Sequence, residues 1–350
     1  MAAKDFLEID GDYLEGGGQI LRTACAVSVI TGRPIRVFNI RAKRPEPGLK
    51  AQHLVTIDAL RELSHSSVEG LKLGSKEIKF KPQEKSIASR LINIDIGTAG
   101  SIGLLLQAVL LAAAFHSEGV SLYIKGGTCG LGAVPVDYYI HVILPILYRS
   151  GLRASLKILR RGYYPKGGGE VSVEISPLKY PKPIDLIKQG NIQRIAGFSI
   201  ASRDLMSREV AQRQAEEAKK ILKRDFSCPL IIKSEYADTY STGSEINLYA
   251  FTDMHCVLGA DSRGEVRKSA EEVAAEACAK LKEEIVSGAA CDTHLADNLI
   301  PWLGILGGKI KVSQISMHTK TNIWIMEQFF GKIFNTEENI ISAKNAEEGC

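Results

Sequence analysis

Residues 11–53 read GDYLEGGGQILRTACAVSVITGRPIRVFNIRAKRPEPGLKAQH, and the order of elements within them decides the fold. The apolar pattern predicts a helix at about Gln19–Thr31, a strand at Pro34–Ile40 and a second helix at Leu49–Ser64. A basic loop, Arg41–His53, begins after the strand and runs into the second helix. The stretch therefore predicts one unit of an α/β domain.

The same order of elements recurs in the middle of the chain. There the sequence predicts a helix at about Ser101–His116, a strand at Ser121–Lys125 and a helix at Tyr138–Ser150. A glycine-rich loop, Gly126–Pro135, joins the strand to the second helix. This copy has its glycine-rich loop at the point where the first copy has its basic loop.

A third copy follows towards the C-terminus. A capping box at Ser269–Glu272 predicts the start of a long helix. The remaining elements are a short helix from His294, a strand at Lys309–Ile315, a loop at Ser316–Lys320 and a helix at Thr321–Phe330. The three copies share little sequence, so it is their common order of elements that predicts a pseudo-threefold α/β domain.

The residues between the second and third copies have a different character. The sequence predicts a strand at Ile192–Ala201, a charged amphipathic helix at Ser207–Lys223 and two strands at Leu230–Glu235 and Glu245–Thr252. We expect them to form a small α/β insert at 185–265. Residues 1–184 and 266–337 would then form the large repeat domain, and the polar residues 338–350 a frayed tail.

The composition limits the class of protein. Apolar residues make up 45% of the 350, which is ample for a core, and a net charge of +4 favours a local basic groove over a basic coat. The seven cysteines are scattered without a CxxC pair, which predicts reduced thiols rather than a zinc site. The longest apolar stretch, Ile102–Phe115, is shorter than the roughly 20 residues of a membrane span. With no apolar signal segment at the N-terminus, these features predict a cytoplasmic protein that does not enter a membrane.

Two segments of the first copy could bind phosphate. At Glu15–Arg22 the three glycines expose backbone N–H groups at a helix N-terminus, where phosphate binds well. Glu15 would repel phosphate unless a cation lay between them, so it is a candidate Mg²⁺ ligand; the alternative is a turn with a solvated carboxylate. The basic loop adds arginine forks that bind phosphate oxygens bidentately, although charged loops are usually only solvated. Together the two segments predict nucleotide chemistry on a phosphorylated, nucleic-acid substrate.

Other polar residues have a functional and a structural interpretation. His318 lies where a loop meets a helix, and neutral imidazole is a competent nucleophile towards phosphorus. His294, Asp297 and Asn298 share one helix face, which is either a site or a polar surface. Gln107 interrupts an apolar helix and is either satisfied in the core or directed into a site.

Seven ordered motifs between about Asp10 and Gly331 resemble the RNA 3′-terminal phosphate cyclases. They are EGGGQILR, an RxxRxxPGLxxQHL-like loop, GTAGSIGLLLQ, KGGT, RRGYYPKGGGEV, HLADN and MHTKTN. The resemblance implies a large domain of three βαβαββ-type repeats with a small inserted α/β domain. It also implies an ATP-dependent enzyme that converts an RNA 3′-terminal phosphate to a 2′,3′-cyclic phosphate through a covalent histidine–AMP intermediate.

The resemblance also implies roles for individual residues. His318 matches the nucleophile, and Glu15 matches the carboxylate that binds Mg²⁺ or Mn²⁺. The matches around the phosphates are Arg22, Arg41, Arg44, Gln52 and His53, and those in the ATP pocket are Gln107, Pro135, His294, Asp297 and Asn298. Pro135 and His294 would lie on either side of adenine. Some relatives have Tyr in place of His294 and Gln in place of Asn298, which could alter nucleotide preference.

The expected partner is RNA with a 3′-terminal phosphate, bound by a monomer or a homodimer. One competing interpretation is a non-catalytic relative of these cyclases that acts in ribosomal RNA processing and lacks the histidine, which this chain has at His318. An enolpyruvyl transferase and a plain RNA-binding module are two further alternatives, and neither would form a histidine–AMP adduct.

Overall fold

The computed structural model describes residues 6–83, 91–130 and 132–345, and three of its four-stranded sheets share one strand order. Parts of the predicted large domain (1–5, 84–90), one residue of the predicted glycine-rich loop (131) and the end of the predicted tail (346–350) lie outside these residues. In each of the three sheets the first two strands in the chain run parallel, and the last two are antiparallel neighbours. The predicted threefold repetition is confirmed.

In each of the three sheets, the fourth strand along the chain lies between the second and the third. The first sheet contains, from one edge to the other, β1 (Leu7–Asp10), β2 (Ile35–Phe38), β4 (Ile78–Lys81) and β3 (Ser67–Glu69). The second contains β5 (Leu91–Asp95), β6 (Val120–Gly126), β8 (Gly169–Ser176) and β7 (Arg153–Arg160). The third contains β9 (Ile184–Leu186), β14 (Gly308–Lys311), β16 (Ile340–Ala343) and β15 (Phe334–Glu337).

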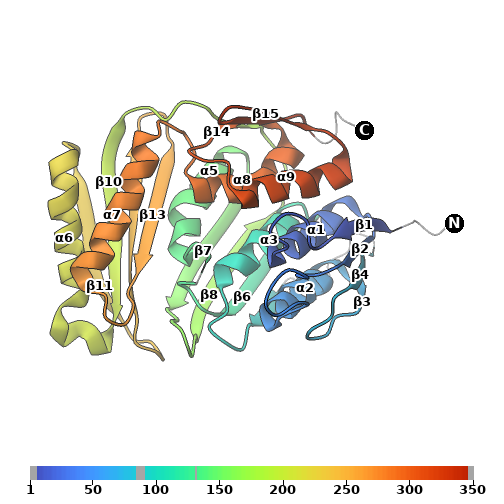
Figure 1. Ribbon diagram of the computed structural model, residues 1–350, viewed down its shortest axis with the longest axis horizontal. Helices are drawn as coiled ribbons and strands as arrows, with labels where there is room; N and C mark the ends of the chain where they lie inside the picture. The colour runs from blue at the N-terminus through green and yellow to red at the C-terminus, as the bar shows by residue number, and fades with distance from the viewer. Residues whose placement is uncertain (1–5, 84–90, 131, 346–350) are drawn as a thin grey trace.

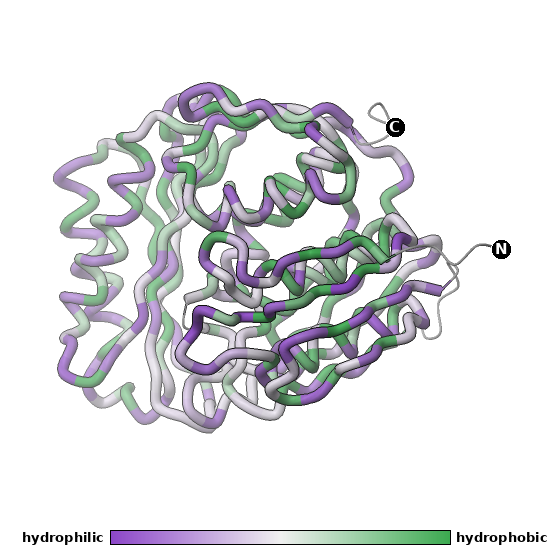
Figure 2. Tube along the Cα trace, turned by 45° about the vertical axis from the view of Figure 1, so that its right-hand side comes forward, coloured by the Kyte–Doolittle hydropathy of each residue, from purple (hydrophilic) through white to green (hydrophobic). Residues whose placement is uncertain are grey.

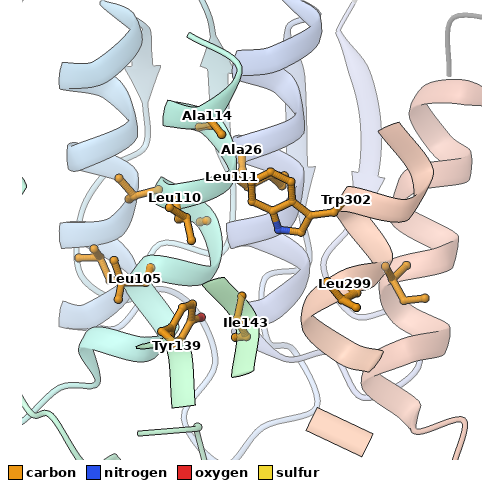
Figure 3. Packing of buried hydrophobic residues seen from close by; sticks show 14 of the residues in the cluster. Ala26, Leu105, Leu110, Leu111, Ala114, Tyr139, Ile143, Leu299 and Trp302 are labelled. Atoms are coloured by element: carbon orange, nitrogen blue, oxygen red, sulfur yellow. The ribbon is translucent and has the colours of Figure 1, made fainter. Parts of the chain in front are cut away.

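The helices of the three repeats pack against one another and share one core. They are α1 (Gly18–Thr31), α2 (Ala51–Ser64), α3 (Ile102–Ala114), α4 (Val136–Tyr138), α5 (Leu144–Arg149), α8 (Thr293–Leu306) and α9 (Met317–Phe330). Figure 3 shows part of this core, where Trp302 of α8 lies near Leu111 of α3 and Ala26 of α1. One apolar core joins the three repeats. Polar loops from different repeats can therefore lie next to one another at the edge of this core.

The insert is a separate layer with its own core. Its sheet contains β11 (Leu230–Ala237), β10 (Ile192–Ser202), β12 (Ser244–Thr252) and β13 (Val257–Arg263), in that order across the sheet. The helices α6 (Val210–Asp225) and α7 (Ala270–Val286) pack against this sheet, and in Figure 1 the strand β13 lies between α7 and β7 of the second repeat. Along these two helices the tube in Figure 2 alternates between hydrophilic and hydrophobic segments, as expected for helices with one buried face.

The structure corrects the assignment of α7 to the third copy. Val273, Ala277 and Leu281 of α7 are buried with Ile195 and Leu222 in the core of the insert, and the third repeat uses α8 as its first helix. Sequence periodicity identified the helix and its capping box correctly, but it does not say which sheet the apolar face covers. The boundary at 265 stays a prediction, and this packing favours moving it to Val286.

Three other expectations are wrong. The predicted helix Tyr138–Ser150 is divided into α4, a π-helical turn at Tyr139–Ile143 and α5. The helix from His294 is not short, since α8 continues through Pro301 to Leu306. Residues 340–343 of the expected frayed tail form β16, because Ile341 is fully buried and the strand is hydrogen-bonded on both sides.

Candidate active site

A cavity of about 370 Å³ lies where the N-terminal ends of α1, α2, α3, α8 and α9 meet. Segments from all three repeats contribute to its wall. Ten of the twelve residues predicted for the site line it, and these are Arg22, Arg41, Arg44, Gln52, His53, Gln107, His294, Asp297, Asn298 and His318. The other two are Glu15, which contacts His318, and Pro135, which directly follows the lining residue Val134.

His318 lies in the first turn of α9, and not in the predicted loop Ser316–Lys320. The helix begins at Met317 because the Ser316 hydroxyl accepts a hydrogen bond from the N–H of Thr319 at 2.9 Å, which caps its N-terminus. The His318 side chain is 51% exposed, and its Nδ1 lies 3.4 Å from Oε2 of Glu15. An Nδ1 proton directed at the carboxylate leaves Nε2 with a lone pair.

Asp297 fixes the start of α9. Its Oδ1 accepts hydrogen bonds from the hydroxyls of Thr319, at 2.6 Å, and Ser316. Its backbone carbonyl accepts a third bond, at 2.8 Å, from Nδ2 of Asn322. Asp297 also lines the cavity, so it links the helix that carries His318 to the predicted nucleotide pocket.

Gln19 is a residue of the site that the sequence did not single out. Its Nε2 donates a hydrogen bond of 2.9 Å to the backbone carbonyl of His318, and the side chain lines the cavity. This contact joins α1 to α9, although the two residues are 299 positions apart in the sequence. The EGGGQILR motif includes Gln19, but nothing in the sequence alone indicates its partner.

Arg22 is a buried cation that faces the cavity. Its side chain is only 6% exposed, and burial lowers its pKa to about 10. Within the described ranges no residue accepts a hydrogen bond from its Nε, and none forms an ion pair with it. A buried charge without a counter-charge is costly. Its position at the cavity wall therefore favours an anionic ligand.

Two more guanidinium groups come from the basic loop. Arg41 has a positive φ of 57°, and burial together with the neighbouring Arg44 lowers its pKa. The Nε atoms of both residues are also buried without a hydrogen-bond partner in the part of the chain that the structure describes. Nη2 of Arg44 lies 3.8 Å from Oε2 of Glu15. Three arginines therefore surround a cavity whose nearest carboxylates are Glu15 and Asp297.

His53 supplies an uncharged donor beside these cations. It is 1% exposed, and its Nδ1 accepts a hydrogen bond of 3.1 Å from the backbone N–H of Lys50, so Nε2 carries the proton. Burial, with the charges of Arg22, Arg41 and Lys50, lowers its pKa to about 3. The imidazole packs so closely on Gly18 that a Cβ there would lie 2.1 Å from Nε2.

The predicted nucleotide side of the cavity is formed around Asn298. Its Oδ1 accepts a hydrogen bond of 3.2 Å from the hydroxyl of Tyr139, and its Nδ2 donates one of 2.8 Å to the carbonyl of His294. Tyr139 lines the cavity and was not predicted, because its position depends on the π-helical turn. Pro135 does not line it, so the expected stacking of Pro135 and His294 on adenine stays a prediction.

Two carboxylates lie near a divalent cation's possible place at this site, and Oδ1 of Asp297 already accepts two hydrogen bonds. Among the described residues there is no group of three or more His, Cys, Asp or Glu side chains that could hold a metal ion by themselves. Glu15 is the candidate, with its side chain 35% exposed beside the cavity. Mg²⁺ commonly binds through one or two carboxylates together with substrate phosphates and water, so this donor set fits it when phosphates are bound.

Known proteins resemble this chain over almost its whole length. A model of the family described as RNA 3′-terminal phosphate cyclase matches residues 13–336. A protein named RNA 3′-terminal phosphate cyclase from Thermococcus kodakarensis is 44% identical over 336 residues, 96% of each chain. A protein of the same name from Pyrococcus furiosus is 44% identical over 95% of each chain. Another from Methanopyrus kandleri is 42% identical over 92% of this chain and 93% of its own length.

Proposed function

The chain belongs to the RNA 3′-terminal phosphate cyclase family, and we propose that it converts the 3′-terminal phosphate of RNA to a 2′,3′-cyclic phosphate with ATP. The observation that carries this proposal is the position of His318 at a cavity lined by Arg22, Arg41 and Arg44. A nucleophile and three cations in one cavity suit the transfer of a nucleotidyl group between phosphates.

In the first step, Nε2 of His318 attacks the α-phosphorus of ATP. An N–P bond forms, the bond to pyrophosphate breaks, and the histidine carries AMP with a proton on Nδ1. Glu15, 3.4 Å from Nδ1, stabilises the positive charge that develops on the ring. The half-exposed side chain of His318 is accessible to the nucleotide.

In the second step, an oxygen of the RNA 3′-phosphate attacks the phosphorus of the histidine–AMP, and the N–P bond breaks. The RNA end is then joined to AMP through a pyrophosphate linkage. In the third step, the 2′-oxygen attacks the terminal RNA phosphorus while its proton passes to solvent water, and AMP leaves. The vicinal hydroxyl is already positioned for this attack, and AMP is a far better leaving group than oxide or hydroxide.

The arginines and His53 supply charge and hydrogen bonds for these steps. Arg22 and Arg44 bind phosphate oxygens, and the pKa of His53 near 3 keeps it neutral, so that its Nε2–H donates without adding charge. Gln107, His294 and Asn298 contact the nucleotide. Glu15 would hold a divalent ion such as Mg²⁺ against the phosphates, where the ion neutralises charge on the transferring group.

Two further expectations remain predictions: a cytoplasmic location, and a monomer or homodimer. In the part of the chain that the structure describes, no helix is long and apolar enough to cross a membrane. The presence of His318 favours the enzyme over the non-catalytic relative that acts in ribosomal RNA processing.

A direct test uses an RNA oligonucleotide with a labelled 3′-terminal phosphate. Incubation with the protein, ATP and Mg²⁺ should make the label resistant to phosphatase, because a cyclic diester is not a phosphatase substrate. Label that stays fully sensitive to phosphatase, while the folded protein still binds the RNA, would favour the non-catalytic alternative.

A further inference from the structure

A second cavity, of about 780 Å³, lies between the insert and the repeats, and we call it the insert cleft. One wall contains the starts of α6 and α7 and the loop at 264–268. The opposite wall contains Gly100, Ser101, Tyr163 and Tyr164 of the second repeat. Gln52 lines both this cleft and the cavity of the candidate active site, so the two spaces meet at one side chain.

The insert cleft is strongly basic. Its lining includes Arg208, Arg213, Arg263, Arg267 and Lys268, against the single carboxylate of Glu265. Three of the cations already have acidic partners: Arg213 lies 2.7 Å from Glu271, Arg263 lies 3.1 Å from Glu265, and Lys268 pairs with Glu276.

Arg208 and Arg267 are different from the other three cations. Both are exposed, and within the described residues neither forms an ion pair. The start of α7 in the same wall adds little positive charge, because Glu271 and Glu272 lie in its first turn. The positive charge that the cleft has available for an anionic chain is therefore that of Arg208 and Arg267.

Exposed aromatic rings lie beside this charge. Tyr164 lines the cleft with 72% of its surface exposed, and it lies in the loop that joins β7 to β8. Tyr240 is 57% exposed and lies against Gly168 of the same loop. The Tyr240 hydroxyl accepts a hydrogen bond of 2.5 Å from Nη1 of Arg160, whose guanidinium carbon is 5.0 Å from the ring centroid. Exposed rings among cations are the usual surface for single-stranded nucleic acid, because bases stack on the rings while the cations neutralise phosphates.

We propose that the insert cleft binds the nucleotides that precede the RNA 3′ end, as a single strand. This inference rests on the proposed function, which puts the terminal phosphate beside Arg44. From there the strand passes Gln52 and the start of α3 and enters the cleft. Its phosphates lie near Arg208 and Arg267, and a base stacks on Tyr164. The insert is then part of the substrate site.

The test reverses the two available charges. The double variant Arg208→Glu/Arg267→Glu is compared with Lys219→Glu/Lys233→Glu, which makes the same charge change at exposed positions of the insert outside the cleft. Substrates are a 3′-phosphorylated 12-nucleotide RNA and a 3′-phosphorylated dinucleotide. For the 12-mer, we expect the cleft variant to raise KM about tenfold at low salt and to reduce the slope of log affinity against log salt by about 1.4.

Two readouts should stay unchanged in the cleft variant. These are covalent labelling by α-labelled ATP alone, and kcat/KM for the dinucleotide, which lacks most of the upstream nucleotides that the proposal places in the cleft. Equal KM values for the 12-mer in the cleft and control variants would overturn the proposal. A wild-type protein that cyclises neither substrate would overturn the proposed function instead, and fluorescence anisotropy with the 12-mer would then still compare RNA binding by the two variants.

Discussion

Oε2 of Glu15 lies 3.4 Å from Nδ1 of His318, so the first and third repeats meet at the candidate nucleophile. The same carboxylate lies 3.8 Å from Nη2 of Arg44. Glu15 can therefore orient the imidazole as well as hold a cation. These two roles make different predictions.

Glu15→Gln keeps the side-chain size and removes the charge. We expect covalent labelling by α-labelled ATP to slow by about 10²-fold, because the developing imidazolium loses its carboxylate. A metal titration separates the roles: a rate restored by excess Mg²⁺ indicates a metal ligand, whereas a rate that stays low indicates orientation of His318. Unchanged labelling at limiting Mg²⁺ would remove Glu15 from the site.

Arg22→Met should destroy activity without destabilising the fold. Within the described residues Arg22 has no acidic partner, so replacement by an apolar side chain leaves no carboxylate unpaired, and the free energy of unfolding should rise by about 1 kcal/mol. Urea denaturation measures this change. Pyrophosphate should raise the Tm of the wild type more than that of the variant. A loss of several kcal/mol in stability would instead indicate a structural role for Arg22.

His53 makes stability depend on pH. Its folded pKa of about 3 lies below the ordinary value of 6.5, so the unfolded chain binds a proton that the folded chain does not. The stability this provides is complete above pH 6.5 and falls as the pH drops from 6.5 towards 3.

Between pH 6.5 and 5, the wild type should therefore lose about 2 kcal/mol more stability than His53→Gln. Urea denaturation at the two pH values, with the exposed His65→Gln as the matched control, measures the difference. Parallel pH profiles for the wild type and His53→Gln would contradict the buried neutral imidazole.

Gly18→Ala tests the contact between α1 and His53. The new Cβ would lie 2.1 Å from Nε2 of His53, so the imidazole or the helix must move. We expect a loss of about 1–3 kcal/mol in stability and a higher KM for 3′-phosphorylated RNA. Wild-type values of both quantities would show that the two segments are further apart in solution.

The sequence predicted the helices of the repeats and one strand in each of their sheets, β2, β6 and β14, because helix starts and alternating strands are local signals. It did not single out the other strands of these three sheets. It identified the capping box at Ser269–Glu272 and the three copies correctly. It misassigned α7 and missed β13, where Gly259 and the polar residues that follow it resemble a linker although the strand pairs with β12. The sheet that α7 covers and the pairing of β13 both depend on tertiary packing, and sequence periodicity carries no information about that packing.

In the candidate site, too, local sequence signals identified some residues, and contacts between distant segments determined the others. Motifs led to ten of the residues that line the cavity, since functional side chains cluster at the helix starts that those motifs describe. Gln19 and Tyr139 were missed because they act through partners distant in sequence, the carbonyl of His318 and the amide of Asn298. The cap formed by Ser316 places His318 on a helix, whereas the sequence pattern predicts a loop there.

The most direct measurement is covalent labelling with α-labelled ATP and Mg²⁺, followed by a denaturing gel. The wild type and Lys320→Ala, an exposed neighbour on α9 outside the cavity, should each give a band that is acid-labile and alkali-stable. His318→Ala should give none, with a Tm close to that of the wild type because the side chain is half exposed. Labelling that persists in folded His318→Ala would contradict His318 as the nucleophile, and no labelling of the wild type would contradict the enzyme.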